Sequence, residues 1–168
     1  MKFADLRLND EIHLIGATGL EMAFCVHYLF QQGYRNLVLH DLAEDYKKSF
    51  FHAHQFIPFA ESNKRWQVLE SIGFSKNTNY ADQELQKARV LFLPQSWYLH
   101  EQNTVLSGYA QKFLFFTDLV FSVFPGRIAA VTGSVGKSTT CSLISQLCDG
   151  LCWGNDRENS FALDDLLN

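Results

Sequence analysis

The stretch Ile128-Ala-Ala-Val-Thr-Gly-Ser-Val-Gly-Lys-Ser-Thr-Thr140 decides the architecture expected of this chain. Its apolar start predicts a β-strand, and its glycines predict a turn. Beyond the turn, apolar residues recur at helical spacing from Thr139 to Cys148, which predicts a helix. A strand, a glycine loop, a lysine with a hydroxyl residue, and a helix follow one another in the order of a phosphate-binding loop.

Each residue type in this loop suits an anion. Glycine lets the backbone turn tightly and point successive N–H groups at one phosphate. Lys137 supplies a point charge and is the candidate catalytic residue, while the Ser138 hydroxyl can help to hold Mg²⁺ through the nucleotide. The helix N-terminus adds backbone donors and a favourable dipole. The predicted nucleotide-binding residues are Gly133, Ser134, Val135, Gly136, Lys137, Ser138 and Thr139, although Val131 stands where the usual pattern has another glycine.

The start of the chain predicts a βαβ unit. Residues 11–16 form a short apolar run, residues 20–33 have helical periodicity, and residues 36–41 form a second apolar run that ends in an acid. This order is typical of a Rossmann-like nucleotide-binding domain, in which the acid can reach a ribose. The candidate substrate contacts here are Gly16, Ala17, Thr18, Gly19 and Asp41. A purely structural interpretation of these residues also stays open, in which the glycines form a tight turn packed beneath a helix and Asp41 caps the next helix.

Further elements continue the α/β pattern as far as a Pro-Gly turn. Residues 88–94 and 113–117 are apolar runs that predict buried strands. The predicted helices are 82–87, 97–112 and 118–124, the last of them capped by Thr117. We place a domain boundary at Pro125-Gly126, so residues 1–125 form a Rossmann-like parallel-sheet domain and residues 126–168 begin a P-loop ATPase domain.

Composition excludes several classes of partner. Apolar residues make up 47% of the 168 residues and the net charge is −4, which predicts a folded protein without the basic field that nucleic-acid binding needs. We expect no nucleic-acid partner and no membrane partner, because no apolar run of spanning length is free of charges or proline. The N-terminus has charges where an export signal has its apolar core, so we expect a cytoplasmic protein. The four cysteines are expected to be reduced core residues, and no resident metal site is predicted.

The loop resembles that of a known family. Val131-Thr-Gly-Ser-Val-Gly-Lys-Ser-Thr-Thr140 is similar to the ATP-binding loop of the Mur ligases, which lacks the first glycine and so accounts for Val131. Downstream, Trp153-Gly-Asn155 resembles a Gly-Gly-Asn segment with which the family approaches a substrate diphosphate. This makes Asn155 a further candidate substrate contact.

The resemblance implies a function. It is strongest to the branch that joins D-glutamate to UDP-N-acetylmuramoyl-L-alanine in peptidoglycan-precursor synthesis. ATP with Mg²⁺ would phosphorylate the substrate carboxylate, and the amine of the amino acid would attack the acyl phosphate. Residues 1–125 would bind the UDP substrate. The family needs further catalytic residues and a third domain beyond Asn168, so the chain is expected to be an N-terminal part that is inactive alone.

This chain departs from the family at several positions. Val135 stands where the family has Asn, Leu42 where a hydroxyl residue is usual, and Leu93-Pro94-Gln95 where it has Ser-Pro-Gly. Two alternatives therefore remain open. One is a non-catalytic module or remnant that binds a nucleotide or UDP-sugar, and the other is a Rossmann oxidoreductase domain that binds NAD through Gly16, Gly19 and Asp41.

Overall fold

The computed structural model describes residues 2–75, 80, 82–124 and 126–150. It divides the chain into two compact units, Met1–Ser122 and Val123–Asn168. Asn155, with the neighbouring Trp153 and Gly154, lies outside the described residues. Each unit is considered by itself below.

The first unit is built on a parallel sheet. Strand β1 (Ile12–Ile15) lies at its centre, and the strand order is β2-β1-β3-β4 with every pair parallel. The other strands are β2 (Leu37–His40), β3 (Val90–Leu93) and β4 (Phe113–Phe115). The α/β class and the parallel sheet predicted from the sequence are confirmed. The chain leaves β1 toward β2 on one side and returns to β3 on the other, so the carboxyl ends of β1 and β3 form the topological switch point at which open α/β sheets bind ligands.

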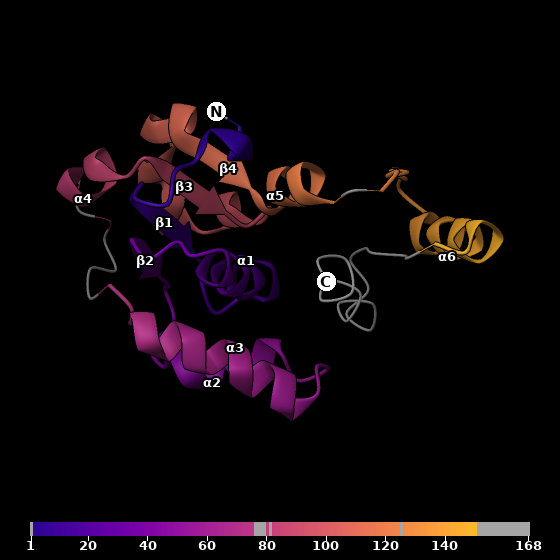
Figure 1. Ribbon diagram of the computed structural model, residues 1–168, viewed down its shortest axis with the longest axis horizontal. Helices are drawn as coiled ribbons and strands as arrows, with labels where there is room; N and C mark the ends of the chain where they lie inside the picture. Colours follow the sequence, from indigo (N-terminus) through magenta and orange to yellow (C-terminus); the bar gives the residue numbers. More distant parts are fainter. Residues whose placement is uncertain (1, 76–79, 81, 125, 151–168) are drawn as a thin grey trace. The chain divides into compact units, whose positions relative to one another are not determined.

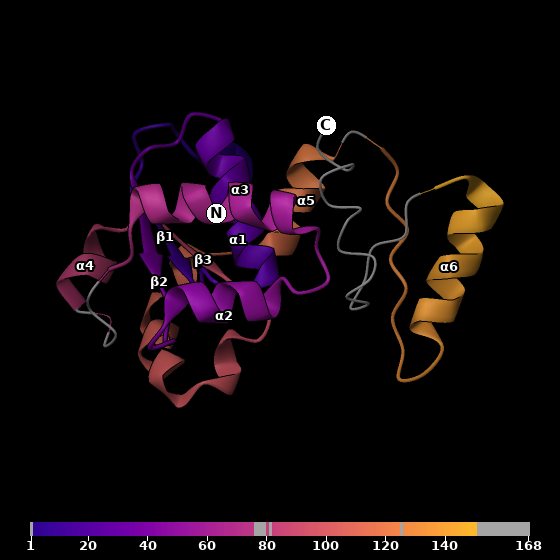
Figure 2. The same cartoon turned by 90° about the horizontal axis from the view of Figure 1, so that it is seen from below.

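One face of the sheet packs against helices α1 (Leu20–Gln31) and α5 (Phe116–Val123). The Phe24 ring of α1 meets the Phe116 ring of α5 edge to face at 5.7 Å. Helices α2 (Tyr46–Ala53) and α3 (Phe59–Ile72) lie on the same side as α1, and α3 packs on α1 (Figures 1 and 2). Burial on this side is nearly complete, since Leu14, Met22 and Leu29 have no exposed surface.

The opposite face packs against helix α4 (Asp82–Lys87) and the 3₁₀ segment η3 (Glu101–Lys112). Ile15, Leu91 and Leu93 of the strands form one buried cluster with Leu85 of α4 and Leu106 of η3. Because both faces are covered, the strands are continuous apolar runs rather than alternating ones. Two histidines, His13 and His40, interrupt this pattern on the second face, and both are buried.

Two predicted elements were wrong in detail. Residues 97–112 are 3₁₀ segments, η2 (Trp97–Leu99) and η3, rather than one α-helix. Hydroxyl groups within η3 bond to nearby carbonyls, Thr104 to that of Glu101 and Ser107 to that of Thr104, which competes with regular helix formation. Helix α5 begins at Phe116, so Thr117 lies inside it, and the Asp118 carboxylate accepts the Phe115 N–H instead.

The strand expected at Ile128 is absent from the described part of the second unit, where residues 126–136 form no strand. A strand needs a neighbour to satisfy its backbone groups, and the described residues 123–150 hold none for it to pair with. Helix α6 (Lys137–Cys148) does form, but none of its residues is buried. The expectation that the cysteines belong to a core holds for Cys25 and is wrong for the exposed Cys148.

In the part of the chain that the structure describes, helices are too short or too polar to cross a bilayer.

The central position of β1 leads to a stability prediction. Leu14→Ala should lower the free energy of unfolding by about 3 kcal/mol, because it opens a cavity beneath α1. Leu99→Ala is the control, since its side chain is 68% exposed, and it should cost less than about 0.5 kcal/mol. Urea titration of each variant measures the difference. Equal losses for the two variants would contradict the packing described here.

Candidate functional site

The glycine loop of the second unit leads into the N-terminus of α6. Gly133 has φ +149° and Gly136 has φ +79°, both in the region that favours glycine. A Cβ atom added at either position would meet no atom closer than 3.8 Å. Glycine is therefore favoured here by the positive φ angle and not by a lack of space. Gly136 is the N-cap of α6, and its carbonyl accepts the Thr140 N–H at 2.9 Å as the first helical bond.

The first turn of α6 brings the predicted phosphate ligands together. Lys137, Ser138 and Thr139 occupy this turn, and the N–H groups of a helix's first turn have no partner within the helix. The Lys137 ammonium folds back to donate to the Gly133 carbonyl, so it lies over the loop. Residues 132–140 are all exposed, and Val135 is 93% exposed. The arrangement combines a positive charge, a helix N-terminus and an open loop, which together can hold a phosphate group.

A metal could be held here only together with a ligand. No group of three or more His, Cys, Asp or Glu side chains suited to a metal occurs among the described residues. The exposed Ser138 hydroxyl in the first turn fits the role of one oxygen ligand to an ion that the nucleotide's own phosphates carry.

In the first unit, the loop 16–19 lies at the carboxyl end of β1. Gly16 has φ +70°, and a Cβ on Gly19 would come within 3.2 Å of the Gly16 carbonyl, so both glycines serve a tight turn. The backbone donors of this loop are all used within the protein. The His40 carbonyl accepts from Gly16 N–H at 2.8 Å and from Ala17 N–H at 3.0 Å, and the Gly16 carbonyl accepts from Gly19 N–H at 2.9 Å.

Asp41 completes this pattern. One carboxylate oxygen accepts from Thr18 N–H at 2.8 Å, and the other accepts from Ala43 N–H at 3.0 Å. The Thr18 hydroxyl lies 2.9 Å from the hydroxyl of Ser49 on α2. The structure thus brings all five predicted residues of the first unit together. It also gives them bonds to one another, so the backbone of loop 16–19 is not free to cradle a phosphate.

Sequence reasoning missed Glu21 in the first turn of α1. Its carboxyl group bonds to the backbone of Gln95, which follows β3, so it bridges the two sides of the switch point. Burial raises the pKa of Glu21, and the Gln95 N–H partly offsets this. Below it, burial and the Glu21 charge raise the pKa of the Cys25 thiol well above its usual value, which leaves an inert thiol. The sequence offered one indication of this role, namely that Glu21 closely follows the glycine turn 16–19.

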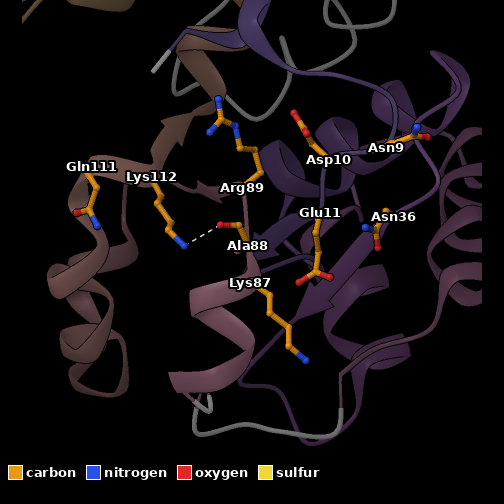
Figure 3. A pocket seen from close by; sticks show the side chains of 9 residues that line it. All are labelled: Asn9, Asp10, Glu11, Asn36, Lys87, Ala88, Arg89, Gln111 and Lys112. Atoms are coloured by element: carbon orange, nitrogen blue, oxygen red, sulfur yellow. Dashed lines mark hydrogen bonds between the residues drawn. The ribbon is translucent and has the colours of Figure 1, made fainter.

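A cavity of about 560 Å³ opens at the opposite, amino-terminal edge of the sheet (Figure 3). Charged and amide side chains line it, among them Glu11, Lys87, Arg89 and Lys112. Lys112 has a structural role. Its ammonium donates to the carbonyls of Leu85, Gln86 and Ala88 at 2.8 to 2.9 Å and so caps the end of α4. Glu11 connects the cavity to the buried histidines, since its carboxylate lies 3.0 Å from His13 Nε2.

Comparisons with known proteins supply no relative. The chain matches no protein-family model, and neither a curated protein nor a solved structure matches it.

Two buried histidines generate a prediction about pH. Burial, assisted by the neighbouring His13, lowers the pKa of His40 to about 4, and burial likewise lowers the pKa of His54 to about 4. An unfolded histidine has a pKa near 6.5, so the unfolded chain binds more protons between these values. The free energy of unfolding should therefore be steady above pH 6.5 and fall as the pH drops to 4, by up to about 3 kcal/mol for each histidine.

Urea titrations of the native chain and of His54→Phe at pH 7 and pH 4 measure this effect. The substitution should shrink the difference in unfolding free energy between the two pH values by up to about 3 kcal/mol, whatever it does to stability at pH 7. Acid protonation of the carboxylates is common to both proteins and cancels. An unchanged difference would show that His54 titrates normally in the folded state.

Proposed function

We propose that this chain binds the phosphates of ATP at the loop 133–139, as part of an ATP-dependent ligase that joins an amino acid to a nucleotide-linked carboxylic acid. The observation that carries the proposal is the loop that leads into α6. It combines two glycines with positive φ, a lysine and a hydroxyl residue in the first helical turn, and residues that are all exposed to solvent. The resemblance of Val131 to Thr140 to the Mur ligase loop gives the proposal its reaction class.

Each residue has a distinct role in the proposed complex. The amides of the first turn of α6 and the Lys137 ammonium stabilise negative charge on the β- and γ-phosphates. To do so, the ammonium exchanges the Gly133 carbonyl for a phosphate oxygen, which is a stronger partner because it is charged. Mg²⁺, when bound with ATP, neutralises phosphate charge, and Ser138 would be its ligand from this chain.

The first unit is proposed to bind the nucleotide end of the second substrate, a UDP-N-acetylmuramoyl-L-alanine-like molecule, with D-glutamate as the amino acid. Its switch point lies between loop 16–19 and the residues after β3. Since the loop amides are engaged, the exposed Gln95 side chain and the Glu21 carboxyl group are better placed to contact a ligand.

The same geometry disfavours NAD. A Rossmann domain holds the ribose with a free acid after the second strand. Here each oxygen of Asp41 already accepts a backbone N–H group, so a ribose hydroxyl would have to share these oxygens with Thr18 and Ala43. Asp41 serves as a loop anchor instead.

The ATP proposal is tested by isothermal titration of the chain with Mg-ATP. Lys137→Ala should weaken binding by at least about tenfold, because a charged contact to phosphate is lost. Arg127→Ala is the matched control, since it removes one exposed positive charge from the same unit but outside the loop. Equal affinity of Lys137→Ala and the native chain, or equal losses for the two variants, would overturn the assignment of the loop.

A parallel titration with UDP tests the proposed reaction class separately from the assignment of the loop as an ATP site. Binding of both ATP and UDP, with only ATP binding sensitive to Lys137→Ala, is expected for a two-substrate ligase. Binding of ATP alone would leave a simple nucleotide-binding module. Protection of the protein against thermal unfolding by NAD, without any by UDP, would favour the oxidoreductase alternative.

A further inference from the structure

A chain of three side chains crosses the second face of the sheet. The Glu11 carboxylate lies 3.0 Å from His13 Nε2, and His13 Nδ1 lies 2.9 Å from His40 Nε2. The imidazole centroids are 5.0 Å apart with an interplanar angle of 25°. Together with the short contact between nitrogens, this places the rings edge to edge in a hydrogen bond rather than face to face. Both imidazoles are about 98% buried, whereas the Glu11 side chain is 29% exposed at the cavity.

The hydrogen-bonding chemistry of Glu11, His13 and His40 fixes which of their atoms carry protons. An ionised Glu11 only accepts, so His13 Nε2 carries a hydrogen and His13 Nδ1 is an acceptor in the neutral ring. His40 Nε2 must then donate, which leaves His40 Nδ1 as a bare lone pair. That atom is buried and has no hydrogen-bond partner. One added proton fits this chain, because the two rings can still share one N–H···N bond while the Glu11 carboxylate balances the charge on His13.

A second proton does not fit. With both rings charged, every ring nitrogen is a donor, and two N–H groups face each other across 2.9 Å. The rings must then separate. His40 is the last residue of β2, so it is the partner that can move.

The backbone of His40 is also what holds loop 16–19. Its carbonyl accepts the N–H groups of Gly16 and Ala17, and the next residue, Asp41, accepts that of Thr18. A movement of the end of β2 therefore withdraws the two acceptors, the His40 carbonyl and the Asp41 carboxylate, that take three of the loop's N–H groups. The histidine pair and the loop are linked through one residue.

Three titratable side chains near Glu11, His13 and His40 are bonded to other groups. The Tyr80 ring lies 5.5 Å from that of His40, but its hydroxyl donates to Asn103 Oδ1 at 2.8 Å. Asp41 is bonded to backbone amides, and Lys112 at the end of η3 is bonded to the carbonyls of α4. Helix α4 carries two acids, Asp82 and Glu84, and Arg89 stands before β3 at the amino-terminal edge.

We propose that Glu11, His13 and His40 form a pH-sensitive latch, in which the neutral or singly protonated chain holds loop 16–19 on β2 and protonation of both imidazoles releases it. The latch acts on the loop at the switch point, whatever ligand binds there. Burial and the charge of His13, which lower the pKa of His40 to about 4, place the release in the acidic range.

Nitrogen-15 NMR of the complete chain between pH 7.5 and pH 3.5 tests the latch. Above the transition, the ring shifts should report Nε2–H tautomers for both histidines. The amide signals of Gly16, Ala17 and Thr18 should then change with the same midpoint as the His40 ring, and at a higher pH than those of Leu91 and Leu93 in β3. Loop amides that stay unchanged while His40 titrates, or that change only together with β3, would overturn the proposal.

Two matched variants distinguish the latch from general acid unfolding. Glu11→Gln keeps the shape but removes the charge that stabilises a protonated pair, so the loop transition should move to lower pH by about one unit. Glu70→Gln makes the same charge change on the exposed surface of α3 and should leave the midpoint in place. His13→Phe should abolish the linked transition of the loop amides. Equal midpoints for Glu11→Gln and Glu70→Gln would refute the proposed role of Glu11, His13 and His40, even if His13→Phe does not fold.

Discussion

Burial of β1 between two parallel neighbours is the constraint on which the first unit depends. Each backbone group of this strand must be paired, because water cannot reach it. The pairing of Ile12 with both Leu37 and Val90 sets the register on the two sides. That register brings the ends of β1, β2 and β3 to one edge of the sheet, where the Gly16 turn, Asp41 and Gln95 meet. The position of the candidate substrate site is therefore set by the hydrogen-bonded pairing of the strands rather than by the loops themselves.

The same burial makes polar residues in the strands costly. A buried histidine is tolerated when its nitrogens are bonded, and His13 achieves this with Glu11 on one side and His40 on the other. His40 Nδ1 is the exception, with no partner. Such an atom costs about 1 to 3 kcal/mol of folding free energy, so this arrangement lowers the stability of the fold. It also makes the end of β2 sensitive to protons, which apolar residues at these positions could not do.

The two candidate sites differ in how they are built. Loop 133–139 depends on local conformation alone: two glycines with positive φ and a helix that begins at Lys137. Its conformation needs no distant residue, and its residues are exposed. Loop 16–19 depends on residues more than 20 positions away, His40 and Asp41, which use up its donors. The local pattern predicts the backbone conformation in the first case, whereas in the second the Gly-x-x-Gly pattern predicts a turn but not which groups the turn leaves free.

The sequence by itself determined the parallel α/β sheet, most of its helices and strands, and the turn and helix at Gly133 to Cys148, because continuous apolar runs, helical periodicity and glycines act over short distances. Only the tertiary structure decided that Asp41 anchors a loop, that Glu21 bridges the switch point, and that Glu11, His13 and His40 touch. These contacts join strands whose register no local pattern encodes. The missing strand at Ile128 has the same origin, since an apolar run becomes a strand only where another strand can take its hydrogen bonds.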